Sequence, residues 1–252
     1  MDRGSGRNRG REVIFGRKRR SDLVEDAGAG PVEVPADEDE SLSDQEAEDS
    51  ADSVTEDVDQ ALETEDQDWR ADGPFDYDEV DLGAEVARID LETLIITPWD
   101  GLNLQLQVDE ESRRVLAVTG VWAESGLELV LFAAPAVGGL AADLRAEAIA
   151  EAEQANGTVE VAVGAFGPEL RRVLPQSGPK GEKLFHVSKV WFAEGPRWLL
   201  RGTLLGEAAL DTVAQDKTAP FVEFFRNVVV RRGNQPMVPG DRITMRLPEG
   251  AS

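Results

Sequence analysis

The residues that could perform chemistry in this chain of 252 residues are few. Its only histidine is His186, and Ser188 lies two positions away in the same run. Residues at i and i+2 of a strand share a face, but this spacing alone does not pair a serine nucleophile with a base. No Gly-x-Ser-x-Gly turn accompanies them. We therefore interpret His186 as a structural or exposed residue and name no catalytic residue.

Metal and cofactor chemistry have as little support. The chain contains no cysteine, which excludes thiolate metal ligands, disulfide bonds and cysteine nucleophiles. The stretches 164–167 and 175–183 contain glycine but lack the spacing of a dinucleotide fingerprint or a P-loop, so both are interpreted as turns. The sequence predicts no cofactor and no metal site. An enzyme with a carboxylate-based site that motifs do not reveal stays open as an alternative.

Four cations near one expected hairpin form the best candidate for a binding site. Residues 183–192 and 197–205 are expected strands, and a three-residue loop between them would place residues of equal parity on one face. On that assumption, one face carries a basic strip consisting of Lys183, Lys189, Arg197 and Arg201. Such a strip could bind an anion or an acidic peptide, including an acidic segment of the same chain. A solvated face with local salt bridges is the alternative interpretation.

Charge divides the chain into three parts. Residues 1–20 carry eight Arg or Lys and two acids, whereas residues 21–72 carry 21 acids and one base. The acidic stretch repeats no apolar face, so it cannot offset about 1–2 kcal/mol of backbone entropy per ordered residue. We predict a basic disordered tail (1–20), an acidic disordered arm (21–72) and a single α+β domain (73–252).

The basic tail contains the segment VIFGRKRR at residues 13–20. It could contact nucleic acid or a membrane surface, but salt weakens such contacts and the acidic arm that follows repels phosphate. We interpret the segment as a solvated tail, and nucleic acid is not the expected partner. The sequence shows neither a signal peptide nor 18 consecutive apolar residues, which predicts a cytoplasmic protein without a membrane span.

Within the domain, strands precede the first helix. Apolar alternation and turn residues predict strands at 89–97, 102–108, 114–124 and 127–134, a helix at 140–155, a strand at 158–166, and then the hairpin of 183–192 with 197–205. A helical region is expected from Glu207, with Pro220 breaking or restarting it and Thr218 as N-cap. Its apolar stripe is expected to run to Val229, with Arg231 and Arg232 at the helix end. The segment 241–248 is a candidate edge strand.

This order of elements is not typical of a parallel α/β sheet. We predict a mainly antiparallel sheet of about 6–8 strands with two main helices packed on it. Trp69, Phe75 and Tyr77 stand among acids just before the first strand. They are expected to dock this lead-in onto the domain, and a linear motif for a partner is the alternative.

Three stretches resemble an uncharacterised actinobacterial domain-of-unknown-function family: GPFDYDEVD (73–81), GPRWLLRGTLLG (195–206) and VVVRRGNQPMVPGDRITMRLP (228–248). The resemblance covers about residues 70–248. That family has no established activity, so the resemblance implies no functional residue. Its members often begin near an FGRKRR-like segment, which suggests Val13 as the native start. In topology, the expected fold resembles the Mog1/PsbP-type sandwich, whose members bind partner proteins.

These observations favour a non-catalytic protein-interaction module in the cytoplasm. The expected partner is a protein of unknown identity, and docking of the chain's own acidic arm is a further hypothesis. The alternatives are the enzyme with an unrecognised carboxylate site and weak nucleic-acid association through the basic tail.

Overall fold

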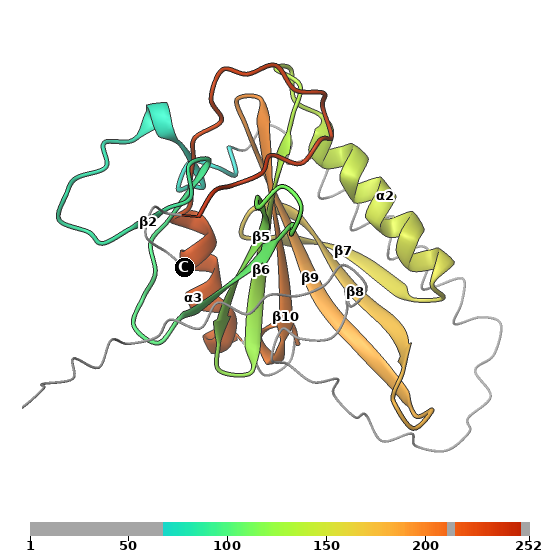
Figure 1. The fold of residues 1–252 in the computed structure, drawn as a ribbon. Coiled ribbons are helices and arrows are strands. Elements are labelled where there is room, and N and C mark those ends of the chain that lie inside the picture. Colours follow the sequence, from blue (N-terminus) through green and yellow to red (C-terminus); the bar gives the residue numbers. More distant parts are fainter. Residues whose placement is uncertain (1–67, 211–214, 248–252) are drawn as a thin grey trace, which may run out of the picture.

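The computed structural model describes residues 68–210 and 215–247, and Figure 1 labels its elements. The basic tail and most of the acidic arm lie outside the described residues. The largest element is an antiparallel sheet in the order β4-β5-β6-β10-β9-β8-β7. Its strands are β4 (Asn103–Val108), β5 (Val115–Trp122), β6 (Ser125–Ala133), β7 (Thr158–Gly164), β8 (Gly167–Ser177), β9 (Lys183–Gly195) and β10 (Trp198–Gly206).

A smaller sheet of four strands has the order β1-β11-β3-β2. Its strands are β1 (Phe75–Asp76), β2 (Ile89–Asp90), β3 (Leu94–Ile96) and β11 (Val229–Val230). The prediction of one strand over 89–97 is wrong, because β2 and β3 pair antiparallel with each other. The Asp90 carboxylate accepts a hydrogen bond from the Glu92 amide at 2.8 Å, and Glu92 has a φ of 74°, so the chain reverses there.

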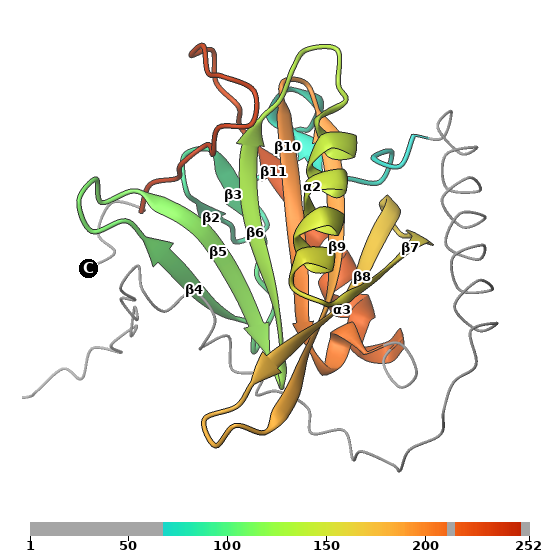
Figure 2. The same cartoon turned by 90° about the vertical axis from the view of Figure 1, so that its right-hand side faces the viewer.

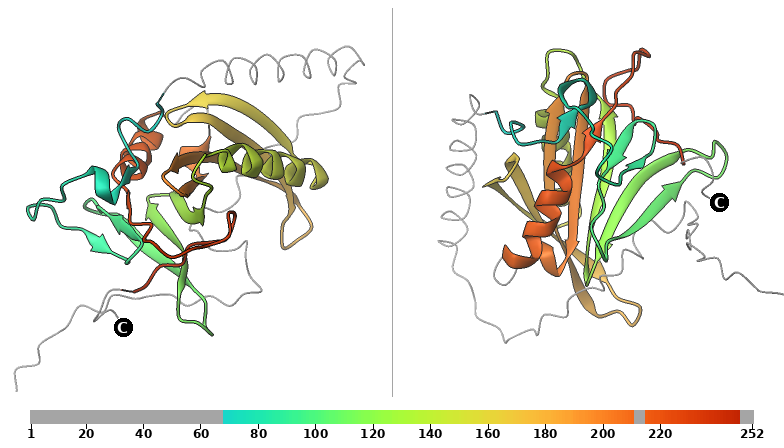
Figure 3. Two further views of the ribbon diagram at one scale, coloured as in Figure 1. Left: turned by 90° about the horizontal axis from the view of Figure 1, so that it is seen from above. Right: turned by 90° about the vertical axis from the view of Figure 1, so that its left-hand side faces the viewer.

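Two helices cover opposite faces of the seven-stranded sheet, as Figures 2 and 3 show. They are α2 (Leu140–Gln154) and α3 (Gln215–Arg226), and the short 3-10 turns are η1 (Tyr77–Glu79) and η2 (Glu207–Ala209). The predicted α+β class, with a mainly antiparallel sheet and two main helices, is confirmed. No helix within residues 68–210 and 215–247 is long and apolar enough to cross a membrane.

Helix α3 differs from the prediction at both ends. Thr218 is not an N-cap: it lies inside the helix, and its hydroxyl donates to the Ala208 carbonyl at 2.7 Å. Pro220 also lies inside the helix and does not break it. The helix ends at Arg226, so Val229 belongs to β11 and not to the helical stripe. Arg231 and Arg232 therefore follow a strand.

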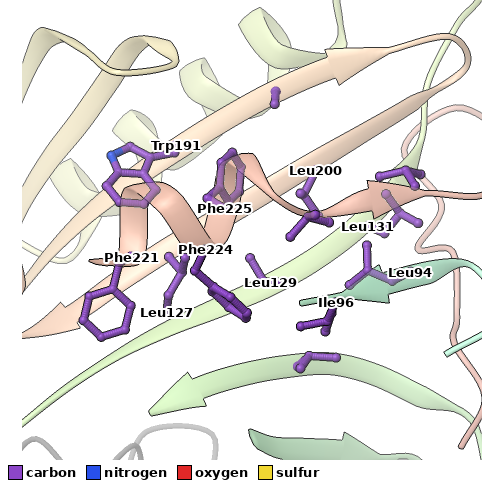
Figure 4. Close-up of a cluster of buried hydrophobic side chains, with 14 of the residues drawn as sticks. Leu94, Ile96, Leu127, Leu129, Leu131, Trp191, Leu200, Phe221, Phe224 and Phe225 are labelled. Atoms are coloured by element: carbon purple, nitrogen blue, oxygen red, sulfur yellow. The ribbon is translucent and has the colours of Figure 1, made fainter. Parts of the chain in front are cut away.

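The main core lies between α3 and the sheet (Figure 4). Phe221, Phe224 and Phe225 are almost completely buried, and the Phe225 ring centroid lies 5.7 Å from that of Trp191. A methyl group at Gly202 would stand 2.7 Å from the Phe225 ring, so this glycine lets the helix approach the strand closely. Ring-to-ring packing of this kind anchors α3 on the sheet.

A second, smaller core lies between α2 and the other face. Alternate residues of the same strands supply it, including Val130, Val190 and Leu199, and α2 contributes Leu140. The alternation is that expected of strands buried on both sides, because successive side chains point to opposite faces. Both helices therefore depend on the same central strands.

The segment 241–246 is hydrogen-bonded to two strands in the middle of the seven-stranded sheet. Pairing between β5 and β6 extends only to Val118 and Leu129, and beyond this point the strands separate. Ile243 donates to the Leu131 carbonyl at 2.8 Å, and the amide and carbonyl of Met245 bond to Val115 on the other strand. The segment thus lies between β5 and β6, so its assignment as an edge strand is wrong.

The aromatic lead-in docks onto the domain. Trp69 covers Gly167, where a methyl group would stand 3.1 Å from the indole ring. The Asp76 carboxylate accepts a 2.7 Å hydrogen bond from the Trp198 indole, and both residues are buried. Contacts with the domain therefore begin at Trp69, four residues before the expected domain start at residue 73.

Candidate functional site

The hairpin of β9 and β10 decides where the four predicted cations lie. Trp198 pairs with Gly195, so only Pro196 and Arg197 connect the strands. The expectation of a three-residue loop is wrong, and the change of one residue reverses the parity rule. Odd-numbered residues of β9 share a face with even-numbered residues of β10.

The four cations are consequently separated. Lys189 pairs with Leu204 and is buried on the α3 side, whereas Arg201 pairs with Phe192 on the α2 side. The other two lie at the strand ends: Lys183 is exposed at the start of β9, and the guanidinium of Arg197, in the turn, donates to the Gly233 carbonyl at 3.2 Å. The four do not form one strip, and what they bind stays a prediction.

Arg201 is instead one of three half-buried arginines on the α2 side of the sheet. Arg172 lies on β8 between Leu170 and Leu174, and Arg145 lies on α2. We call the three residues Arg145, Arg172 and Arg201 the arginine face. Helix α2 packs on β7, β8 and β9, so the guanidinium groups lie at the margin of the second core.

Few hydrogen bonds satisfy these guanidinium groups. Arg172 Nε donates to the hydroxyl of Ser188 at 3.3 Å. The Nε atoms of Arg145 and Arg201 are buried and have no hydrogen-bond partner among the described residues. Each of these two groups instead lies over an aromatic ring, Arg145 at 5.8 Å from the centroid of Phe192 and Arg201 at 5.4 Å from that of Phe132. A cation–π contact orients a guanidinium but leaves its N–H donors unused.

Burial affects the pKa of all three side chains. Desolvation lowers the pKa of Arg145, Arg172 and Arg201, and the nearby charge of Arg201 lowers that of Arg172 further. A guanidinium nevertheless stays protonated in proteins, so the cluster remains cationic. Carboxylates influence Arg201 from a distance, namely Glu128, Glu147 and Glu151. Among the described residues, none of them forms an ion pair with the arginine face.

His186 and Ser188 lie on the same side of β9 as this cluster. Burial and the charge of Arg172 lower the pKa of His186 below its ordinary value. Ser188 is fully buried and accepts the Arg172 hydrogen bond. The Ser188 hydroxyl thus contacts Arg172, and the interpretation of His186 as a structural or exposed residue stays a prediction.

A carboxylate already occupies the N-terminus of α2. Both side-chain oxygens of Glu194, from the end of β9, accept hydrogen bonds from the amides of Gly139, Leu140 and Ala141 at 3.1–3.3 Å. These amides are otherwise unpaired at a helix start. The amides at this helix terminus are thus satisfied by a carboxylate of the same domain.

The buried carboxylates have structural partners. Glu169 accepts hydrogen bonds from the Trp191 indole at 2.8 Å and from Arg171 Nε at 3.0 Å, as Asp76 does from Trp198. A shallow pocket of about 200 Å³ lies between β7, β8 and η2, and Glu160 is the one carboxylate that lines it. Within residues 68–210 and 215–247, no three His, Asp or Glu side chains gather as a metal site would require.

Sequence reasoning missed Arg145 and Arg172, although the sequence contained a signal for each. Arg145 falls at helical spacing from Ala141, Ala148 and Ala152 and thus interrupts an apolar stripe. Arg172 alternates with Leu170 and Leu174 in a strand that was not predicted. Burying a cation within an apolar pattern costs free energy, so a cation at such a position indicates a role. This criterion would have identified both arginines.

Comparisons with known proteins give one match. Residues 73–252 match a family model described as Protein of unknown function (DUF3710). No curated protein and no solved structure matches the chain.

Proposed function

Because the chain belongs to this DUF3710 family, whose description names no activity, we propose a function from the site: the domain is a non-catalytic protein-interaction module that binds an acidic protein segment at the arginine face. One observation carries the proposal. Three half-buried guanidinium groups have no carboxylate at ion-pair distance among the described residues, in a chain with 50 acids.

The chemistry of arginine supports a carboxylate as the ligand. A guanidinium presents a planar fork of donors that matches two carboxylate oxygens, and such charge-assisted pairs are about twice as strong as neutral hydrogen bonds. The rings of Phe132 and Phe192 fix two of the three groups, so little conformational entropy remains to be lost on binding. A partner's Asp and Glu side chains would accept hydrogen bonds from the terminal N–H groups of these half-buried side chains.

The local acids set a condition on the partner. Glu128, Glu147 and Glu151 influence Arg201 without reaching it, and they repel a second negative charge. A ligand must therefore insert its carboxylates between these acids and the guanidinium groups. A flexible acidic segment meets this requirement better than a rigid negatively charged surface, because each side chain adjusts separately.

Titration with a hexaglutamate peptide tests the proposal. The protein used is the full chain with the acids of 21–67 replaced by Asn and Gln, so that acids of the same chain cannot compete. Isothermal titration is expected to show binding that weakens at least tenfold in the triple variant Arg145→Gln, Arg172→Gln, Arg201→Gln. Tenfold corresponds to about 1.4 kcal/mol.

A matched control removes three exposed cations elsewhere, through Arg113→Gln, Lys180→Gln and Arg246→Gln. This control is expected to change the affinity less than twofold. Absence of hexaglutamate binding, or an equal loss in both triple variants, would show that the arginine face is not an acidic-segment site.

A further inference from the structure

We infer that the first occupant of the arginine face is a segment of this chain, residues 56–63, which competes with any other acidic partner. The inference rests on the proposed function and names the partner of the same site. The segment contains four acids and no base, namely Glu56, Asp57, Asp59 and Glu63. Its charge complements three cations that form no ion pair with a carboxylate in residues 68–210 and 215–247.

The point at which the chain joins the domain limits which acids can reach the arginine face. Trp69 is packed over Gly167 at the turn between β7 and β8. The next residue, Arg70, forms two hydrogen bonds with the Glu79 carboxylate, one of them 2.8 Å long, and lies 5.5 Å from the centroid of the Trp198 ring. Residues before Trp69 therefore start from a fixed position at the end of the seven-stranded sheet.

The strand register places this start close to Arg201. Leu170, three residues after Gly167, pairs with Val190 of β9, and Arg201 pairs with Phe192 of the same strand. Gly167 and Arg201 thus lie at nearly the same level, two strand spacings or about 10 Å apart. Trp69 lies on the α3 side, so a path to the α2 side over the sheet end adds about 10 Å more.

That path sets which acids can reach the cluster. At about 3.3 Å per extended residue, roughly 20 Å corresponds to six or seven residues. Counting back from Trp69, this interval ends near Glu63, so the acids from Glu63 to Glu56 come level with the arginine face. A short tether gives a local concentration in the millimolar range. An acidic segment of another protein must then displace the internal one.

The competition is measured with hexaglutamate and the wild-type chain. The variant Glu56→Gln, Asp57→Asn, Asp59→Asn, Glu63→Gln is expected to bind the peptide at least tenfold more tightly than the wild type. A matched variant, Asp37→Asn, Glu38→Gln, Asp39→Asn, Glu40→Gln, removes the same charge at positions farther from the domain in sequence. It is expected to change the affinity for the peptide less than twofold. Equal effects of the two variants would overturn the inference in favour of general charge repulsion.

Direct contact is measured with a spin label. The chain has no cysteine, so Ala61→Cys labels one site only. Broadening of the amide signals of Val130 and Leu199 is expected, and it should disappear when the three arginines are replaced by glutamine. No broadening, or broadening only from a labelled to an unlabelled chain, overturns the inference.

The two proposals fail in different ways. If hexaglutamate binds the arm-neutralised chain at the arginine face but the label causes no broadening, the internal occupant is wrong and the proposed function stands. If hexaglutamate fails to bind that chain, the proposed function is wrong, whatever the label shows.

Discussion

The two faces of the seven-stranded sheet are built from alternate residues of the same strands, yet they differ in chemistry. The α3 face is closed by Phe221, Phe224 and Phe225, which pack edge to face against Trp99, Phe166 and Trp191. The α2 face has a smaller apolar core with three arginines at its margin. Helix α3 is held by aromatic burial, whereas on the α2 side the buried Nε atoms of Arg145 and Arg201 have no hydrogen-bond partner among the described residues.

This difference indicates a division of roles. Apolar burial contributes roughly 25 cal/mol per Å², so the aromatic face, which has the larger buried cluster, is expected to contribute more to stability. Half-buried cations without carboxylate partners contribute little or are destabilising. Under the proposed function, the stability that the α2 face lacks is supplied by the α3 face. Four measurements test this comparison, in order of decreasing effect.

The largest expected effect is on the α3 face. Phe225→Ala should lower the free energy of unfolding by about 3–5 kcal/mol, because it removes a completely buried ring and leaves a cavity. Urea denaturation measures the change. Leu144→Ala, at a partly buried position of α2, is the control and should cost less. An equal cost at the two positions would contradict the proposed difference between the faces.

The second effect is on the start of α2. Glu194→Gln removes the negative charge that faces three helical amides and should lower the free energy of unfolding by about 1 kcal/mol. Glu147→Gln, on the exposed side of the same helix, should change it by less than about 0.5 kcal/mol. Equal results would mean that Glu194 is not the cap that holds this helix end.

The third effect has the opposite sign. Arg201→Met keeps the contact with Phe132 but removes a half-buried cation, so the free energy of unfolding should stay the same or rise by up to about 1 kcal/mol. Arg70→Met, which breaks a paired arginine at Glu79, should lower it. Clear destabilisation by Arg201→Met would assign this arginine to the structure and remove it from the binding site.

The smallest effect is on pH dependence. The pKa of His186 is lower in the folded chain than its ordinary value of about 6.5, so the unfolded chain binds the proton more readily. The stabilising effect of the neutral imidazole is complete above pH 6.5 and declines as the pH falls toward the folded-state pKa. His186→Gln should reduce the difference between the free energies of unfolding measured by urea denaturation at pH 7.5 and at pH 5.5. An unchanged pH dependence would mean that burial and the charge of Arg172 do not lower the pKa of His186 in the folded chain.

Much of the fold could be predicted from periodicity. The helix at 140–155 and the strand at 102–108 have clear apolar spacing, and both lie within a residue or two of the structure. Strand β8 was missed because Pro168, Pro175 and two adjacent arginines hide its alternation. The insertion of 241–246 between β5 and β6 depends on contacts between distant residues, which local patterns do not contain.

The candidate site could be predicted less well, because it depends on one turn. Arg197 adopts a φ of 61°, which a non-glycine residue rarely does, and this makes a two-residue connection possible. A shift of one residue in register exchanges every side chain between faces. The sequence therefore gave Arg201 the wrong neighbours on its face of the sheet.

The position of residues 241–246 also bears on how the molecule is made. The ribosome releases β5 and β6 more than a hundred residues before the segment that bonds to both of them. Until that segment emerges, the separated ends of these strands have open edges, which can pair with other chains. Synthesis halted before Asp241 should therefore yield nascent chains prone to aggregation, and the domain acquires its final form only late in translation.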